Sequence, residues 1–169
     1  ETAVGLYSLS ARILATIQAF AIPFTQSVFP RASHLFAEHP ESGWILVRRV
    51  LKLLLPVMTV ICLLVAIAAP LFVHILGGKE YADAVTSLRI MSIVPVLITV
   101  DKVLSEIVMV NVGLSEQLPR IYMIIGAINL ILLWPLIHFY VVNGAAVSLV
   151  VSEAVALLLM FYSIKKMLR

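Results

Sequence analysis

The segment TVDKVLSEIVMV, residues 99–110, places three charged side chains inside an otherwise apolar run. Asp101, Lys102 and Glu106 are residue types that bind anions or cations, exchange protons or form ion pairs. Lys102 and Glu106 are four residues apart and share one face of a helix, whereas Asp101 points about 100° away from Lys102 and is expected to meet another helix. The chemistry that these residues perform depends on the solvent around their helix.

The composition indicates that this solvent is lipid. Hydrophobic residues make up 62% of the 169-residue chain, charged residues make up 12%, and the mean hydropathy is +1.10. A soluble domain averages about 45–50% apolar and about 25% charged residues. The single cysteine, Cys62, cannot form an internal disulfide, and no metal-ligand spacing occurs, so no metal or cofactor is expected. Because the sequence starts at Glu1 without a signal peptide, we expect a fragment of a longer membrane protein.

Five stretches are long enough to cross a bilayer, which takes about 20 mostly apolar residues. An open sheet cannot face lipid, so the expected class is an all-α membrane protein with short loops and antiparallel neighbours. The expected spans are residues 4–36, 44–76, 81–112, 115–140 and 145–168. The breaks between them are expected at residues 40–43, at Gly77 and Gly78, at Gly113, and at Asn143 and Gly144. Kinks are expected at prolines inside the spans, such as Pro23, Pro56, Pro70, Pro95 and Pro135.

Basic residues gather in three regions: after the first span, between the third and fourth spans, and at the C-terminus. They are Arg31, Arg48, Arg49, Lys52, Arg120, Lys165, Lys166 and Arg169. The opposite loops carry Lys79, which is offset by Glu80, and His138. Cytoplasmic loops are enriched in Lys and Arg, so we expect these three regions to share one side of the membrane and the C-terminus to be cytoplasmic.

Two other spans carry polar patterns. In the first span, Arg12, Thr16 and Gln26 fall on one side of a helical projection, which we interpret as a wet or packed face. The fifth span has a small residue at every fourth position, which favours close helix packing, and Glu153 lies beside that ridge. The small residues are Gly144, Ser148, Ser152 and Ala156.

The charges inside the spans allow two interpretations. In the structural one, Lys102 and Glu106 neutralise each other, and Arg12 pairs with Glu153 or Asp101. In the functional one, the charges surround a hydrated cavity that holds a charged substrate while a carboxylate titrates. Charged residues at membrane depth usually face a bundle interior or a cavity. Five such charges exceed what packing requires, which favours the functional interpretation.

Four segments resemble polysaccharide (O-antigen) flippases of the multidrug/oligosaccharidyl-lipid/polysaccharide exporter superfamily. They are AVGLYSLSARILATIQAFAIPFTQSVFPRASHL, similar to the opening of the eighth membrane helix in that family, then LGGKEYADAVTSLRIM, INLILLWPLI and NGAAVSLVVSE. They are distributed along most of the chain, from residue 3 to residue 153, and their order and spacing make the resemblance specific. The family fold has two six-helix lobes around a central cavity. The resemblance places this chain as the last five helices, most of the C-terminal lobe, with the N-terminal lobe of the same protein as its partner.

The resemblance implies transport and not catalysis. These flippases move undecaprenyl-diphosphate-linked oligosaccharides across the bacterial inner membrane, where the protein is multi-pass. The resemblance makes Arg12 and Lys102 candidates for binding the diphosphate, and Thr16 and Gln26 candidates for hydrogen bonds to the sugars. The candidates for proton or sodium coupling are Glu106, Asp101 and Glu153. The expected partners are the lipid-linked oligosaccharide and membrane lipids, with no nucleic acid.

Four other functions are alternatives to this one. A multidrug exporter of the same superfamily would favour acidic residues in its cavity, whereas Arg12 and Lys102 favour an anionic substrate. A flippase for a peptidoglycan precursor would also carry an anionic lipid-linked substrate. A membrane polysaccharide polymerase or ligase is disfavoured, because the expected external loops, residues 77–80 and 140–143, are short. A purely structural subunit remains open, because five helices cannot enclose a two-lobed cavity.

Overall fold

The computed structural model describes residues 2–19, 21–78 and 84–168, and no strand occurs in these ranges. The expected all-α class is confirmed. The helices are α1 (Thr2–Gln18), α2 (Ala21–Glu38), α3 (Pro40–Ile67), α4 (Ala69–Gly77), α5 (Ala84–Met91), α6 (Val94–Lys102), the π-helix η2 (Val103–Met109) and α7 (Gln117–Met167).

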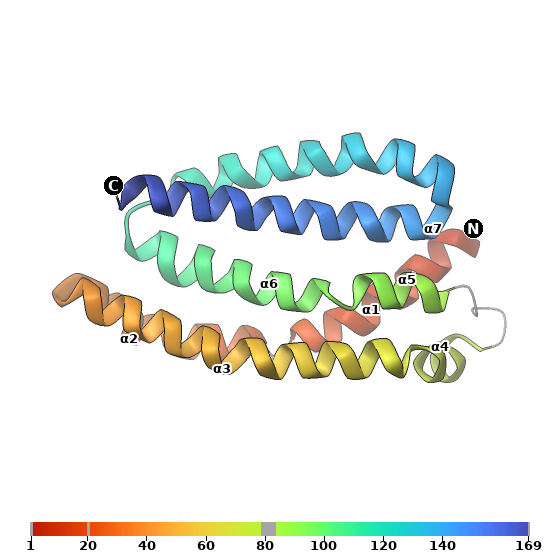
Figure 1. Ribbon diagram of the computed structural model, residues 1–169, viewed down its shortest axis with the longest axis horizontal. Helices are drawn as coiled ribbons and strands as arrows, with labels where there is room; N and C mark the ends of the chain where they lie inside the picture. The colour runs from red at the N-terminus through yellow and green to blue at the C-terminus, as the bar shows by residue number, and fades with distance from the viewer. Residues whose placement is uncertain (1, 20, 79–83, 169) are drawn as a thin grey trace.

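The helices form an elongated bundle with α6 near its middle (Figure 1). Helix α7 doubles back on itself, and its two arms run side by side along one side of the bundle. Helices α2 and α3 form a hairpin on the opposite side. Helix α6 packs against α1, α3 and α7, and η2 packs against α2, α3 and α7. The segment that carries the three clustered charges is therefore surrounded by other helices.

Three stretches are long and apolar enough to cross a membrane, judged by length and composition alone: Tyr7–Glu38, Pro40–Ile67 and Gln117–Met167. The last of these contains both arms of α7. Large apolar side chains of these stretches are exposed, including Trp134 on α7, which is 85% exposed, and Leu64 on α3, which is 60% exposed. Such a surface is stable only against hydrocarbon or further protein, so the chain is embedded in a membrane.

The expected third span is not one continuous helix. It is divided into α5, α6 and η2, with a break at Ser92 and Ile93. Pro95, expected inside a helix, instead lies in the first turn of α6. That position suits proline, because the first N–H groups of a helix have no partner within it.

Several expected helix ends are confirmed. Gly78 and Gly113 have φ angles of +78° and +77°, a conformation that glycine adopts without a Cβ penalty. They follow the ends of the second and third expected spans. The second span also breaks at Ala68, with Pro70 in the first turn of α4, whereas α3 continues through Pro56.

The first expected span contains α1 and α2, and Tyr7–Glu38 is one stretch that is long and apolar enough to cross a membrane. Two expected boundaries are wrong. The expected break at residues 40–43 lies at His39, because Pro40 occupies the start of α3, where its missing N–H costs nothing. The chain between the arms of α7 turns at Val141, with φ 49° and ψ −118°, and not at residues 143–144.

Asn143 and Gly144 have other roles in the structure. The side-chain oxygen of Asn143 accepts a hydrogen bond of 2.8 Å from the hydroxyl of Ser87 on α5. Gly144 is buried against the backbone of Leu136 on the first arm of α7. The ridge of small residues that starts at Gly144 is buried throughout, as its spacing predicted.

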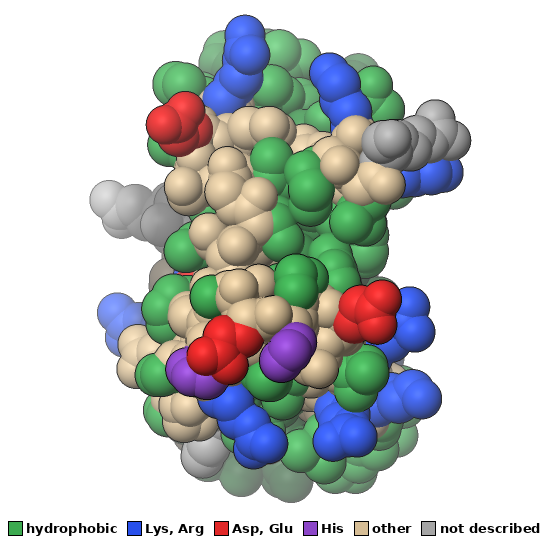
Figure 2. Space-filling view, turned by 90° about the vertical axis from the view of Figure 1, so that its left-hand side faces the viewer, with side chains coloured by type: hydrophobic (Ala, Val, Ile, Leu, Met, Phe, Trp, Pro, Cys, Tyr) green, Lys and Arg blue, Asp and Glu red, His purple; other side chains and the backbone are tan. Residues whose placement is uncertain are grey.

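The three basic regions lie at one end of the bundle. The turn between α2 and α3, the connection from η2 to α7 and the C-terminus all meet there (Figure 1). Lys and Arg side chains lie around the rim of this end, interspersed with acidic and histidine side chains (Figure 2). The three regions therefore share one end of the bundle, as the expected arrangement of spans requires. Lys79 and Glu80, expected at the opposite end, lie outside the described residues.

Replacing Gly144 by alanine tests the closure of the α7 hairpin. A Cβ at this position would collide with the carbonyl group of Leu136 and lie 2.9 Å from the backbone nitrogen of Ile137. We expect Gly144→Ala to reduce the amount of folded protein in membranes severalfold and to lower the melting temperature in detergent. Gly126→Ala is the matched control, because nothing lies within 4 Å of its added Cβ. The control should be neutral or stabilising by up to about 1 kcal/mol, and equal melting temperatures for both variants would contradict this account.

Candidate functional site

The centre of the candidate site is the ion pair expected from the sequence. Lys102 Nζ lies 2.9 Å from Glu106 Oε1. The two side chains remain 37% and 42% exposed. The pair therefore lies on the surface of the central helix and not within its packed core. The two charges of a partly exposed ion pair can separate at a lower cost in free energy than those of a fully buried pair.

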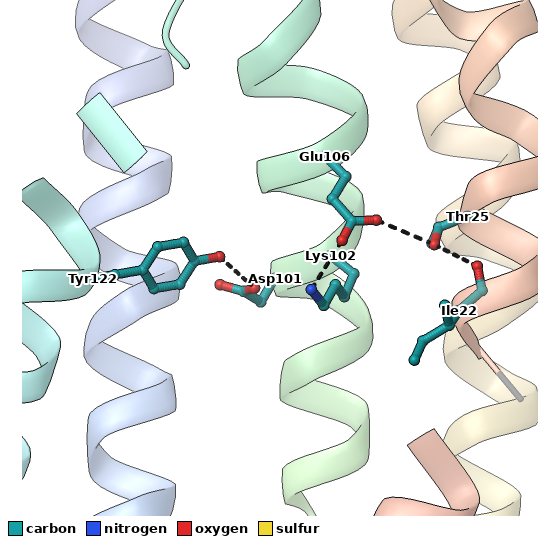
Figure 3. Close-up of polar contacts among 6 residues, drawn as sticks. All are labelled: Ile22, Thr25, Asp101, Lys102, Glu106 and Tyr122. Carbon is teal, nitrogen blue, oxygen red and sulfur yellow. Dashed lines mark hydrogen bonds and ion pairs between the residues drawn. The ribbon is translucent and has the colours of Figure 1, made fainter. Parts of the chain in front are cut away.

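Thr25 connects this pair to α2. Its hydroxyl oxygen is 3.4 Å from Glu106 Oε2 and 3.0 Å from the carbonyl oxygen of Ile22 (Figure 3). One hydroxyl proton can serve one of these acceptors at a time, and the contact with Ile22 is the shorter. The Thr25–Glu106 bond therefore strengthens when the threonine hydroxyl turns from Ile22 toward Glu106.

A π-helix presents Glu106. Every residue of η2 (Val103–Met109) is buried except Glu106. The helix then ends in a Schellman motif at Gly113, in which the N–H of Leu114 donates to the carbonyl of Met109 at 2.8 Å and the N–H of Gly113 donates to that of Val110 at 3.4 Å. Six buried side chains thus pack against α2, α3 and α7 while one carboxylate stays accessible. π-Helices are rare and occur frequently at functional sites.

Asp101 lies on the other side of the helix, as the 100° offset predicted (Figure 3). It is 5% exposed, and its Oδ2 accepts a hydrogen bond of 3.0 Å from the hydroxyl of Tyr122 on the first arm of α7. The expectation that Asp101 meets another helix is confirmed. Its second oxygen, Oδ1, is buried and has no hydrogen-bond partner among residues 2–19, 21–78 and 84–168.

Glu153 approaches the same cluster from the second arm of α7. It is half-buried, and its carboxylate interacts electrostatically with both Asp101 and Lys102. No ion pair links it to any residue that the structure describes. Nearby, the side-chain amide of Asn129 donates to the hydroxyl of Ser152 at 2.9 Å, which joins the two arms of α7.

The remaining candidates from the sequence lie apart from this cluster. Arg12 and Thr16 are exposed on α1, and Gln26 is exposed on α2. The Thr16 hydroxyl donates to the carbonyl of Arg12 at 3.0 Å, within their own helix. The guanidinium group of Arg12 forms no ion pair with the described part of the chain, so its expected pairing with Glu153 or Asp101 is wrong.

Sequence reasoning missed Thr25 and Tyr122. Thr25 lies off the polar face in a projection of the first span, and its contact with Glu106 follows from the packing of α2 against η2. A buried carboxylate needs a hydrogen-bond donor, so the sequence could predict a donor opposite Asp101. It does not show that this donor is Tyr122.

Two curated proteins are similar to this chain, and both are named "Putative O-antigen transporter". The one from Escherichia coli (strain K12) is 30% identical over 169 residues, which cover 99% of this chain and 41% of the relative. The relative from Shigella dysenteriae is 26% identical over 168 residues, which cover 96% of this chain and 40% of the relative. The chain thus spans about two-fifths of the length of these two relatives, and the resemblance found in its motifs is confirmed.

No protein-family model matches the chain, and no solved structure matches it.

A double-mutant cycle tests the role of Asp101 in this relative of O-antigen transporters. Tyr122→Phe removes the hydroxyl and leaves the Asp101 carboxylate buried without that donor. We expect a loss of about 1–3 kcal/mol in unfolding free energy, seen as a lower melting temperature and less folded protein. Asp101→Asn should also destabilise, and the double variant should lose less than the sum of the two single variants. Tyr162→Phe, at an exposed tyrosine of α7, is the control and should change nothing. Additive losses would show that Asp101 and Tyr122 do not act together.

Proposed function

We propose that this chain is part of a transporter that flips undecaprenyl-diphosphate-linked oligosaccharides across the bacterial inner membrane for cell-surface polysaccharide synthesis. The observation that carries the proposal is the partly exposed Lys102–Glu106 pair on the central segment of a membrane-embedded bundle. A charged pair at this depth requires water or a polar ligand beside it. The similarity to two proteins named "Putative O-antigen transporter" supports a role in polysaccharide transport.

The geometry suggests how an anionic lipid would bind. A diphosphate attracts Lys102 strongly where the dielectric constant is low. The ammonium group of Lys102, however, is already paired with the Glu106 carboxylate at 2.9 Å. Binding therefore competes with Glu106 for Lys102. A released Glu106 has a partner ready in the Thr25 hydroxyl, 3.4 Å from its other oxygen. Protonation of Glu106 would remove its repulsion of the diphosphate and its hold on Lys102 together. Substrate binding and proton uptake would then be coupled at this residue.

The other candidates take supporting roles in the proposal. Arg12 is an exposed cation without an ionic partner in the described chain, and it is available as a second contact for the diphosphate. Thr16 and Gln26 lie exposed on α1 and α2 and are available for sugar hydroxyl groups. Asp101 serves mainly to brace α6 against α7 through Tyr122. Glu153, half-buried and near Asp101, is the second candidate for ion coupling.

The proposal includes the surroundings of the chain. An N-terminal lobe of the same protein would close the cavity over the exposed face of Lys102 and Glu106. The end of the bundle that carries most of the Lys and Arg side chains would face the cytoplasm, because cytoplasmic ends of membrane proteins are enriched in these residues. The C-terminus would then be cytoplasmic. The proposed role is transport and not catalysis, in agreement with the names of the relatives.

Export of polysaccharide by the full-length transporter that contains this chain tests the binding role of Lys102. Lys102→Ala should abolish the appearance of surface polysaccharide in a flippase-deficient strain, while the amount of transporter in the membrane stays normal. Lys102→Arg should keep part of the export, because the positive charge remains. Arg12→Ala should behave like Lys102→Ala. Arg49→Ala, at an exposed cation at the end of the bundle, is the control and should export normally. Normal export by Lys102→Ala at normal abundance would make the pair structural and the proposed binding role wrong.

Cysteine labelling from outside intact cells tests the orientation. The one native cysteine, Cys62, is buried, so a Cys62→Ser background is practical. Cysteines at Leu76 and Tyr140, both exposed near the turns opposite the basic end, should react with a membrane-impermeant maleimide. Cysteines at His39 and Gln117, at the basic end, should react after the cells are opened. Labelling of His39→Cys from outside would reverse the orientation.

A further inference from the structure

A groove lies between the N-terminal part of α3 and the C-terminal end of α7. Its volume is about 620 Å³. Val47 and Leu104, each 3% exposed, form its floor, while Ile45, Phe161 and Leu168 line it with exposed side chains. It lies at the end of the bundle where Lys and Arg side chains gather, and the Lys102–Glu106 pair is not part of its lining.

One acidic and one basic side chain line this otherwise apolar groove. Glu41 and Arg48 are seven residues apart on α3, so they lie on the same face of the helix, about 10 Å apart along its axis. Both side chains are exposed, and neither forms an ion pair with a residue in the described ranges. The groove therefore offers one unpaired negative group and one unpaired positive group in a fixed order.

Trp44 lies between these two groups and is held in place. Its ring packs edge-to-face against Phe36 of α2, with 5.6 Å between the ring centroids and 81° between the ring planes. Gly43 makes room for this contact, because a Cβ there would lie 2.8 Å from the Phe36 ring. Tryptophan is enriched at the level of lipid headgroups, where one part of the ring is in apolar and the other in polar surroundings. This part of α3 therefore has the character of the membrane interface.

We propose that the groove binds a zwitterionic aminophospholipid of the phosphatidylethanolamine type. Arg48 would bind the phosphate, Glu41 would accept hydrogen bonds from the ammonium group, and an acyl chain would lie over Phe161 and over Leu51, which is about one helical turn further in than Arg48. The order along α3 supports this assignment. Glu41 is in the first turn, at the end of the bundle, and Arg48 is two turns further in. In such a lipid the ammonium group is outermost, the phosphate lies deeper and the acyl chains lie deepest.

The charges also distinguish this lipid from other occupants. An anionic phospholipid without an ammonium group would satisfy Arg48 but leave Glu41 beside a negative headgroup. A choline headgroup is zwitterionic but has no N–H to donate to Glu41. A covering helix from the rest of the transporter would bury Glu41 and Arg48, and buried charges without partners are strongly unfavourable. A mobile lipid headgroup at the interface satisfies both charges without removing them from water.

Native mass spectrometry of the purified full-length protein tests the proposal. The delipidated protein would be titrated with phosphatidylethanolamine, phosphatidylglycerol and phosphatidylcholine of identical acyl chains. We expect retention of one phosphatidylethanolamine in preference to the other two lipids. Arg48→Ala should weaken its binding about fivefold, the factor for about 1 kcal/mol per basic residue near a lipid surface. Glu41→Gln should reduce the preference over phosphatidylglycerol by a similar factor. Arg49→Ala, at the neighbouring exposed arginine that does not line the groove, should bind like wild type.

Three results would overturn the proposal. The first is equal retention of the three lipids by the wild-type protein. The second is the same loss of binding in Arg49→Ala as in Arg48→Ala, which would indicate a diffuse charge effect. The third is a groove covered by protein, in which a cysteine at Ile45 or Phe161 fails to react with a lipophilic maleimide in the delipidated protein. If Arg48→Ala does not accumulate, Arg48→Gln provides the same comparison. Because the lining of the groove does not include Lys102, none of these results bears on the transport role.

Discussion

The cost of placing charge in a bilayer is the constraint on which this bundle depends. One segment carries Asp101, Lys102 and Glu106 within six residues, and each charge must find a partner. Lys102 and Glu106 satisfy each other on one side of the segment, and Tyr122 serves Asp101 on the other. A segment with polar requirements on two sides is poorly suited to face hydrocarbon. Its place between α3 on one side and α7 on the other is consistent with this requirement.

The features that the sequence predicted are those decided by residues close together in the chain. The helical class follows from composition, the Lys102–Glu106 pair follows from a spacing of four, and the helix ends before Gly78 and Gly113 follow from the conformational freedom of glycine. The buried ridge from Gly144 to Ala156 likewise follows from its spacing. Each of these inferences depends on the residues of a single helix, so it requires no knowledge of the neighbouring helices.

The features that could not be predicted depend on contacts between distant segments. The π-helix Val103–Met109 lies at the packed junction with α2, α3 and α7, and the residue types in its sequence are compatible with an α-helix. The turn at Val141 replaces the expected turn at residues 143–144 because Asn143 bonds to Ser87 and Gly144 packs against the other arm. Thr25 and Tyr122 belong to the site because α2 packs against η2 and α7 packs against α6, and a projection of single spans does not contain these neighbours.

The two carboxylates of the central segment differ in a way that bears on function. Asp101 is almost fully enclosed and tied to Tyr122, so any change in its contacts would disturb the packing of α6 against α7. Glu106 is 42% exposed and lies between two partners, Lys102 at 2.9 Å and Thr25 at 3.4 Å. It can exchange one partner for the other without moving a helix. The outward face of this pair also cannot rest against hydrocarbon, unlike the face of α7 that carries Trp134, which is 85% exposed. The bundle therefore has two unlike surfaces, one suited to lipid and one that requires water, substrate or a polar protein partner, and Lys102 and Glu106 lie on the second.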